Sequence, residues 1–318
     1  MNTKNIESFL GINMLYTIKD HNISPLEWAL KNKEEVQTHL EKTGALLIRG
    51  FEDIKEEDFG TILSLLFGGE LIDYTFRSTP RTELKNKIYT ATEYHHTEWI
   101  PQHNENAYSN KWPSRIGLVC KIKAEKMGNT PISDSRIAYN QIPAEIRDEF
   151  EKKNIMYVRN YSNIIDLPWE EVFQTNNRSE IEAYCKGNNI LAEWTPNGLR
   201  TKQINNATLV HPNTKDKLWF NQAHLFHISN LNSELREDLT AILGEDNLPR
   251  NTYFGDGTSI DPEVLDIIRD VYNNTKVSFD WLENDLLLLD NMLYTHGREP
   301  FEGKRKVLVG MAREHSAS

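Results

Sequence analysis

The sequence predicts a mainly β protein, a β-sandwich or jelly roll with helices at its periphery. Three observations predict this class. Short runs rich in branched and aromatic residues recur between residues 115 and 311, bounded by Gly, Asn, Asp or Pro. Helical patterns dominate the N-terminal third of the chain. Many short strands after a helical beginning are typical of a sheet core that carries added helices.

Four segments are predicted to be helices from their starts and stops. The first, residues 24–44, opens with a Ser-Pro pair, an N-cap followed by proline at the first helical position, and closes with glycine. The second, residues 56–67, is amphipathic and is followed by two glycines. Two further helices begin at residues 143 and 261, where proline again marks the start. The first two define a helical N-terminal part, residues 24–70.

The segments that are predicted to be strands are short, and no linker, repeat or low-complexity stretch separates them. We therefore expect a single domain over residues 1–318, with its β core at about residues 100–313. The predicted strands are residues 45–48, 115–122, 155–159, 218–220, 277–281, 285–289 and 306–311.

Length, charge and cysteine content limit the function classes. The chain has 318 residues, of which 38% are hydrophobic and 26% charged, as in a globular protein with a substantial core. The net charge of -11 argues against a general nucleic-acid binder, which needs a basic surface. Two cysteines provide no disulfide framework, so we expect a cytoplasmic location. We expect no secretory signal and no membrane partner, since the apolar runs are too short to span a bilayer.

Two distant segments carry candidate metal ligands. The segment WIPQHNE, residues 99–105, places His103 and Glu105 two residues apart, and in an extended strand such residues share a face. The segment LDNMLYTHGR, residues 289–298, adds His296. Two histidines and one carboxylate on one face form the non-haem iron arrangement, which leaves coordination positions for a cosubstrate and O2. The pattern therefore favours an oxygenase.

The His-x-Glu pattern alone is weak, because it occurs three times in the chain. His39 and Glu41 lie in the first predicted helix, where residues two apart do not share a face. His96 and Glu98 lie seven residues before the third pair and compete with it, although a solvated loop explains them as well. His296 alone could equally be a packed core histidine.

Further motifs distinguish the third pair. The chain reads HNE at residues 103–105, YS and WP soon after, and TPISDSR at residues 130–136. With these motifs it closely resembles the TauD/TfdA family of Fe(II)/2-oxoglutarate dioxygenases, and most closely its SyrP-like branch, enzymes associated with amino-acid hydroxylation in natural-product pathways. It departs from the branch at Met127 and Asn129, where Gly and Glu are usual. The resemblance covers most of the chain and also includes the segments YVRNY, WFNQ, YFGDG, DNML, HGR and GKR.

The resemblance implies a double-stranded β-helix core in which His103, Glu105 and His296 bind iron. It also implies that Arg305 and Thr130 bind the distal carboxylate of 2-oxoglutarate. Arginine suits this role because its planar guanidinium pairs with both oxygens of a carboxylate. The alternative for Arg305 is a surface charge, in which case Arg313 would take the role, since two-residue parity places it on the same strand face.

The implied reaction is hydroxylation of an aliphatic carbon, with decarboxylation of 2-oxoglutarate to succinate. Related halogenases lack the carboxylate ligand, and Glu105 fills that position here. Desaturation and epoxidation on the same centre stay open. The expected substrate is a polar small molecule, an amino acid that is either free or tethered to a carrier protein. A non-catalytic jelly-roll ligand-binding protein, whose His and Glu residues would be scattered in space, and a metal-dependent hydrolase are the competing classes.

An amino-acid substrate would need a carboxylate clamp. Arg77, Arg81 and Arg298 are candidates for it, because a guanidinium near an iron site is costly unless it is paired. Asn221 and His224 are further candidates for substrate contact. Each of these residues also has a structural explanation, in packing or in surface exposure.

Overall fold

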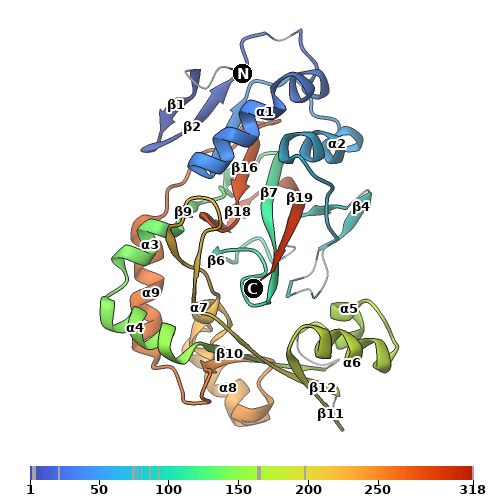
Figure 1. Cartoon of the computed structure of the whole chain (residues 1–318). Helices are drawn as coiled ribbons and strands as arrows, with labels where there is room; N and C mark the ends of the chain where they lie inside the picture. Colours follow the sequence, from blue (N-terminus) through green and yellow to red (C-terminus); the bar gives the residue numbers. More distant parts are fainter. Residues whose placement is uncertain are drawn as a thin grey trace.

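The computed structural model describes residues 1, 5–20, 22–73, 76, 78–79, 81–85, 87–91, 94–162, 166–196 and 198–316. Strands occupy the centre of the molecule and helices surround them (Figure 1). None of the helices in these ranges is long and apolar enough to cross a membrane. The prediction of a mainly β fold with peripheral helices is confirmed, whereas the single domain stays a prediction.

The largest sheet has eight strands and contains the two longest strands of the described chain. These two strands, β7 and β19, pair antiparallel at the middle of the sheet, and only β2 and β3 pair in parallel. The order along the sheet is β1 (Glu7–Phe9), β2 (Ile12–Thr17), β3 (Ala45–Arg49), β16 (Leu286–Asp290), β7 (Lys111–Ile122), β19 (Lys306–Ser316), β5 (Ile88–Thr90) and β4 (Glu83–Lys85).

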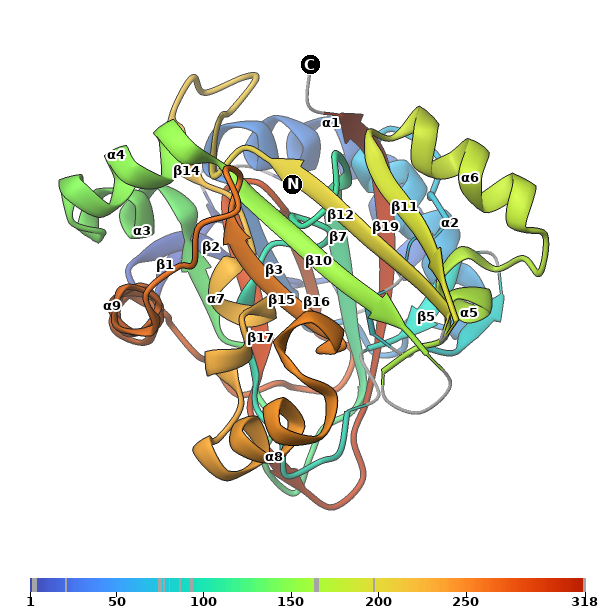
Figure 2. The same cartoon turned by 90° about the horizontal axis from the view of Figure 1, so that it is seen from below.

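The remaining strands form smaller sheets. One has three strands in the order β6 (Ile100–His103), β17 (Tyr294–Arg298) and β9 (Ile132–Asp134). Another has four strands that run side by side across the view of Figure 2: β11 (Ile190–Thr195), β12 (Gly198–Asn205), β10 (Ile155–Tyr161) and β15 (Arg250–Phe254). Two pairs complete the set: β13 (Thr208–Val210) with β14 (Lys217–Trp219), and β18 (Phe301–Glu302) with β8 (Lys126–Met127).

Helices lie outside the sheets. Two of them, α1 (Pro25–Thr43) and α2 (Glu56–Phe67), pack together at the end of the molecule that holds the N-terminus (Figure 1). The others are α3 (Ser135–Gln141), α4 (Ala144–Lys153), α5 (Trp169–Phe173), α6 (Arg178–Gly187), α7 (Ala223–Phe226), α8 (Ser233–Leu243) and α9 (Pro262–Thr275).

The ends of α1 follow the local sequence closely. The Ser24 hydroxyl accepts a hydrogen bond from the Glu27 backbone N–H at 3.2 Å, as an N-cap does. Gly44 ends the helix with a φ of 84°, and a Cβ there would lie 2.8 Å from the Leu293 side chain. Its carbonyl accepts from the Asp290 backbone N–H at 2.7 Å. The end of α1 is thereby held against the turn that connects β16 to β17.

The strand β16 shows why the large sheet is apolar on both faces. Leu286 and Leu288 pack with α1 and α2, whereas Leu287 and Leu289 belong to the cluster on the opposite face. All four are fully buried. A strand covered on both faces is expected to be a continuous apolar run, and this one is.

Two sequence expectations need comment. Residues 277–281 are not a strand, because only an isolated bridge between Val277 and Ile132 forms there. Phe279 and Trp281 of this segment are instead buried in the core, which explains their apolar pattern. The hairpin of β11 and β12 was not predicted, although its residues alternate as strand residues do.

Candidate metal centre

The three predicted metal ligands lie together. His103 ends β6 and is paired in register with His296 of β17, and Glu105 follows two residues after β6. Glu105 Oε2 lies 4.0 Å from His103 Nε2 and 3.8 Å from His296 Nε2. The three ligand atoms lie within 4.8 Å of one another, and no other such group of three occurs among the described residues. These side chains therefore fit a metal ion that takes two imidazoles and one carboxylate.

The two histidines are neutral and one is oriented by the backbone. His103 Nδ1 lies 2.8 Å from the Pro101 carbonyl, which can only accept, so Nδ1 carries the proton and Nε2 offers its lone pair to a metal. Burial lowers the pKa of His103, and it lowers the pKa of His296 to about 3. Since a metal binds the neutral imidazole, both rings are ready to coordinate at neutral pH.

Glu105 is held from two directions. Its backbone N–H donates to Asn291 Oδ1 at 2.7 Å, and Asn291 Nδ2 donates back to the Glu105 carbonyl at 2.9 Å. Its carboxylate accepts from Arg81 Nη2 at 2.6 Å, and both side chains of this pair are only 4% exposed. Burial favours the neutral acid, but the charge and hydrogen bond of Arg81 together with the two neighbouring histidines outweigh it and hold the pKa of Glu105 below its usual value. The carboxylate is therefore ionised and fixed.

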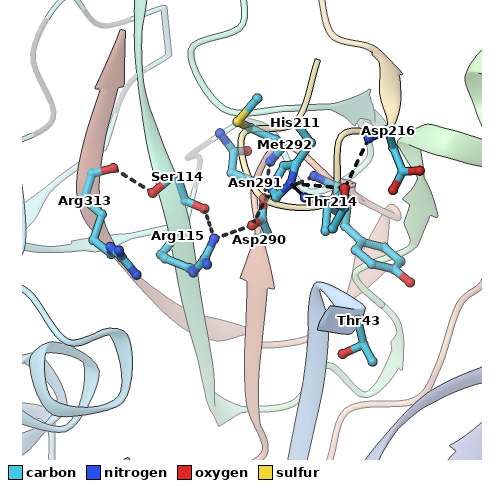
Figure 3. A network of polar contacts seen from close by, with 12 residues as sticks. Thr43, Ser114, Arg115, His211, Thr214, Asp216, Asp290, Asn291, Met292 and Arg313 are labelled. Atoms are coloured by element: carbon cyan, nitrogen blue, oxygen red, sulfur yellow. Dashed lines mark hydrogen bonds and ion pairs between the residues drawn. The ribbon is translucent and has the colours of Figure 1, made fainter. Parts of the chain in front are cut away.

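A buried polar network supports the turn that carries Asn291 (Figure 3). Asp290 Oδ1 accepts from the backbone N–H groups of Met292 at 2.9 Å and Leu293 at 3.2 Å. Its other oxygen accepts from Arg115 and lies 3.2 Å from His211 Nε2. The turn between β16 and β17 is thus fixed, and with it the positions of Asn291 and of His296.

A cavity leads from the metal ligands to a partly buried arginine. Arg305 donates to the Gly128 carbonyl at 2.7 Å and to Thr130 Oγ1 at 3.3 Å. Burial and the Arg298 charge lower the pKa of Arg305 to about 10. A partly buried cation that lies beside another cation favours an anionic ligand. The lining includes His103, His296, Thr130, Arg298, Arg305 and Arg81.

The structure does not bring Arg313 to this cavity. Its side chain is exposed and lies against Gly69, outside the residues that line this cavity. In Figure 3 only its backbone carbonyl joins the network around Asp290, by accepting a hydrogen bond from the Ser114 hydroxyl. Arg313 has a φ of 60°, which breaks the two-residue alternation on which the parity argument depends.

The residues predicted to contact substrate separate in space. Arg81 binds Glu105, and Arg298 donates to the carbonyls of Tyr94, His95 and Glu98 at distances of 3.0, 2.7 and 2.9 Å. Both line the cavity beside the metal ligands. Arg298 therefore fixes the segment before β6, and Arg77 lies outside the described residues.

Two further predicted contacts are not in that cavity. Asn221 is buried, where it donates to the Ala207 carbonyl at 2.8 Å and accepts from the Ala223 N–H at 3.0 Å. These bonds give it a structural role. His224 lines a separate cavity behind β6.

The competing pairs do not join the metal ligands. His96 and Glu98 are exposed, and His96 Nδ1 lies 3.1 Å from the Phe301 carbonyl. His39 is buried in α1, where its Nε2 lies 3.2 Å from the Ala45 carbonyl. Neither pair belongs to the group of ligands found among the described residues.

Sequence reasoning missed part of the site. A cavity of about 540 Å³ opens above His103 and Glu105, and Arg250 forms part of its wall. Arg250 donates to Asp166 at 2.8 Å and to the Ser78 carbonyl at 3.2 Å. No local pattern marks these contacts, because the partners lie 84 and 172 residues away. The motif DNML includes Asn291, but the hydrogen bonds between Asn291 and the Glu105 backbone are seen only in the structure.

Comparison with known proteins identifies relatives over nearly the whole chain. Residues 17–312 match the family described as "Taurine catabolism dioxygenase TauD, TfdA family". The dapdiamide synthesis protein DdaC of Enterobacter agglomerans is 42% identical over 273 residues, which are 86% of this chain and 83% of that protein. A clavaminate synthase-like protein of Arabidopsis thaliana is 26% identical over 293 residues, 88% and 85% of the two chains.

Solved structures share the fold. PvcB from Pseudomonas aeruginosa superposes with a TM-score of 0.53 at 15% identity and covers 93% of this chain and 84% of its own. An asparagine oxygenase in complex with Fe(II), 3-hydroxyasparagine and succinate gives 0.54 at 13% identity, with 92% and 86% covered. At such identities the likeness concerns the fold alone, the double-stranded β-helix that the family resemblance implied.

Proposed function

The chain belongs to the TauD/TfdA family of dioxygenases, and we propose that it is an Fe(II)- and 2-oxoglutarate-dependent hydroxylase of a polar small molecule, an amino acid or an aminoacyl group. The observation that carries the proposal is the group of His103, Glu105 and His296, whose ligand atoms lie within 4.8 Å of one another. The same cavity ends at Arg305. A cavity with a metal site at one end and an arginine at the other suits a diacid that chelates the metal with one end and pairs with the arginine at the other.

The protein residues have separate roles in this proposal. His103, Glu105 and His296 would hold Fe(II), and Arg305 with Thr130 would hold the distal carboxylate of 2-oxoglutarate. Bound Fe(II) would supply O2 activation, with one oxygen atom going to the substrate as hydroxyl and the other to succinate, while CO2 leaves. Ile100, Leu118 and Val309 line the same cavity and make part of its wall apolar.

Arg81 has a positioning role. Its ion pair with Glu105 keeps the carboxylate ionised before metal binding and limits the directions in which it can turn. His103 is limited in the same way by its bond to Pro101. A centre whose ligands are already deprotonated and oriented binds metal with little rearrangement.

The proposed substrate class rests on two observations: the residues that line the cavity above the metal ligands, and the names of similar proteins. The wall of that cavity carries polar side chains, among them Ser78, Thr79, Gln222 and Arg250, beside apolar ones such as Leu225 and Leu231, which suits a molecule with both polar and aliphatic parts. One relative is a dapdiamide synthesis protein, and one structure with the same fold is an asparagine oxygenase. Both names support amino-acid chemistry for this chain. Placement in the SyrP-like branch and tethering to a carrier protein stay predictions.

The test begins with the cofactors. Under anaerobic conditions the purified protein with Fe(II) and 2-oxoglutarate should show the weak visible charge-transfer band of the chelate, and in air it should form succinate. His103→Ala should remove both signals, whereas the matched variant His96→Ala should keep them. If His96→Ala removes the band and His103→Ala keeps it, the ligand assignment is wrong.

The substrate is then sought by succinate release. The common amino acids are screened first, followed by aminoacyl groups on a carrier protein. A product heavier by one oxygen atom supports hydroxylation of an aliphatic carbon or epoxidation of a double bond, and its NMR spectrum separates these two. Loss of two hydrogens indicates desaturation. A protein that neither binds 2-oxoglutarate nor forms succinate would be a binding protein instead.

A further inference from the structure

The irregular segment that begins at Val277 is bonded to the chain on both sides of Thr130. Val277 and Ile132 exchange two backbone hydrogen bonds, at 2.8 and 2.9 Å. On the other side, Asn129 Nδ2 donates to Asp280 Oδ1 at 3.2 Å. The segment is therefore fixed against the loop that carries Thr130, although it is not a strand.

This segment places Trp281 beside Thr130. The indole Nε1–H of Trp281 donates to Thr130 Oγ1 at 3.1 Å, and the side chain is buried, with 4% of the residue exposed. Its ring packs edge-on against Phe279, with centroids 5.1 Å apart. Thr130 lines the cavity of the metal ligands, and Trp281 is not among the residues that line it. Trp281 therefore affects this cavity through the Thr130 hydroxyl.

The bonds that Thr130 accepts leave its proton free. Oγ1 accepts from Trp281 Nε1 and, at 3.3 Å, from Arg305 Nη2. A hydroxyl has two lone pairs and one proton, and neither an indole N–H nor a guanidinium can accept a hydrogen bond. Both lone pairs are thus engaged, and the proton has no acceptor in the described part of the chain. Since Thr130 is 2% exposed and lines the cavity, a ligand in the cavity is the acceptor available to it.

The polar side chains at this end of the cavity are all donors. Arg305 and Arg298 can only donate, and the described lining contains no carboxylate. With its lone pairs engaged, Thr130 becomes a third donor. A carboxylate can accept from all three groups, whereas an alcohol or a primary amide would bring a donor of its own that finds no acceptor at this end.

We propose that Trp281 is a positioning residue for 2-oxoglutarate, because its indole N–H holds the Thr130 hydroxyl as a donor to the distal carboxylate. Without that N–H, one lone pair of Oγ1 is released and the hydroxyl can turn away from the ligand. This role rests on the proposed function, since it concerns the cosubstrate. It also gives a purpose to the buried aromatic segment that resembled a strand in the sequence.

The affinity for 2-oxoglutarate tests the proposal, measured by calorimetry on the full-length protein loaded with Mn(II). Trp281→Phe keeps an aromatic ring and removes the N–H, and it should weaken binding about fivefold, the effect of one ordinary hydrogen bond. Trp112→Phe is the matched control. Trp112 is 3% exposed, belongs to the same buried cluster, and has an Nε1 without a partner in the described chain. It loses the same ring volume and should leave the affinity unchanged.

A double-mutant cycle asks whether the effect passes through the hydroxyl of Thr130. In the Thr130→Val background, Trp281→Phe should weaken binding by less than about a further twofold, because the group that Trp281 orients is gone. Thr130→Ser retains a hydroxyl and should restore the full sensitivity to Trp281→Phe. A ring that served packing alone would give the same factor in every background.

NMR of the metal-free protein tests the hydrogen bond without any ligand and without Trp281→Phe. The indole N–H signal of Trp281, identified by its nuclear Overhauser contacts with the Phe279 ring, should move upfield in Thr130→Val, because the N–H loses its acceptor. The indole signal of Trp112 should stay in place. An unmoved Trp281 signal would mean that the bond on which the proposal depends does not form.

Two binding results also overturn the inference: equal 2-oxoglutarate affinity in the wild-type protein and Trp281→Phe, or a fivefold loss that persists in Thr130→Val. Normal 2-oxoglutarate binding with either result rejects the role of Trp281 alone. A wild-type protein that binds no 2-oxoglutarate rejects the proposed function, and the inference with it.

Discussion

The metal centre and the cavity behind β6 differ in how their polar atoms are satisfied. At the metal centre the fold itself orients the ligands, through Arg81 and Asn291 on Glu105 and Pro101 on His103. Around the cavity behind β6, the buried His224 Nδ1 and Tyr272 hydroxyl have no hydrogen-bond partner in the described chain. The side chains that would hold the metal are therefore oriented by the fold, whereas these two buried groups are left without a hydrogen bond.

Of the variants proposed here, replacement of Arg81 should have the largest effect on the stability of the metal centre. Arg81→Gln leaves the Glu105 carboxylate buried without its cation, which should cost the metal-free protein about 3–5 kcal/mol of unfolding free energy. Saturating Mn(II) should restore most of this loss, because the metal replaces the missing charge. Thermal unfolding with EDTA and with Mn(II) measures both values. An equal loss in the two conditions would show that Arg81 serves the fold and not the centre.

The same ion pair predicts a dependence on pH. The pKa of Glu105 is lower in the folded protein than in the unfolded chain, so the unfolded chain binds more protons as the pH falls. The pair's contribution is therefore complete above the ordinary carboxyl pKa and is lost as the pH falls through the lower folded value. In Arg81→Gln burial should instead raise the pKa of Glu105 above its ordinary value, so the folded variant binds the proton first and its stability should rise as the pH falls through that raised value. Unfolding curves of both proteins across the acid range measure the difference.

Replacing Asn291 tests whether Glu105 must be held in place for the centre to bind metal. Asn291 hydrogen-bonds the Glu105 backbone and is not itself one of the predicted metal ligands. Asn291→Ala should cost about 3 kcal/mol of stability through the buried groups left unpaired, and it should weaken Mn(II) binding about 10–100-fold. Asn221→Ala is the matched control, since Asn221 is also a buried, hydrogen-bonded asparagine but bonds Ala207 and Ala223 and none of the metal ligands. It should lower stability and leave Mn(II) affinity unchanged. Equal metal affinities in the two variants would contradict the role of Asn291.

Metal binding should depend little on pH. The pKa values of His103, Glu105 and His296 all lie below their ordinary values. Few protons must leave on binding, so the Mn(II) affinity should fall less than about threefold between pH 7.5 and pH 5.5. Two histidines of ordinary pKa would give a loss of about 100-fold over that range. Electron paramagnetic resonance titrations of Mn(II) at the two pH values decide between these outcomes.

Thr130 should have a smaller effect. Thr130→Val keeps the volume and removes the hydroxyl near Arg305. It should weaken 2-oxoglutarate binding about tenfold, as expected for one hydrogen bond to a charged group, with little change in turnover once 2-oxoglutarate is saturating. A titration of the anaerobic band with 2-oxoglutarate provides the constant. Unchanged affinity would remove Thr130 from the cosubstrate site.

Tyr272 should have the smallest effect on the fold. Because its hydroxyl has no partner among the described residues, Tyr272→Phe should change the free energy of unfolding by less than about 0.5 kcal/mol. Chemical denaturation of the metal-loaded protein measures this. A loss comparable to that of Asn291→Ala would mean that the fold does use this hydroxyl, and the contrast between the two regions would fail.

The parts of the fold that the sequence predicted correctly have local causes. The helix α1 carries its own cap and stop, and β16 is a continuous apolar run. Residues 277–281 had the composition of a strand but pack as irregular chain, because burial in the core also selects apolar residues. The pairing of His103 with His296 was implied by the family resemblance, and spacing alone left other pairs open. Contacts such as Arg81 with Glu105 and His224 with Gln102 depend on packing and have no sequence signal.

The most direct test of the metal centre is a crystal structure with Mn(II) and 2-oxoglutarate, in which anomalous scattering locates the metal. We expect the ion to bind His103 Nε2, His296 Nε2 and a carboxylate oxygen of Glu105, and the distal carboxylate of 2-oxoglutarate to contact Arg305 and Thr130. An ion bound at another site, with these three side chains uncoordinated, would contradict the account.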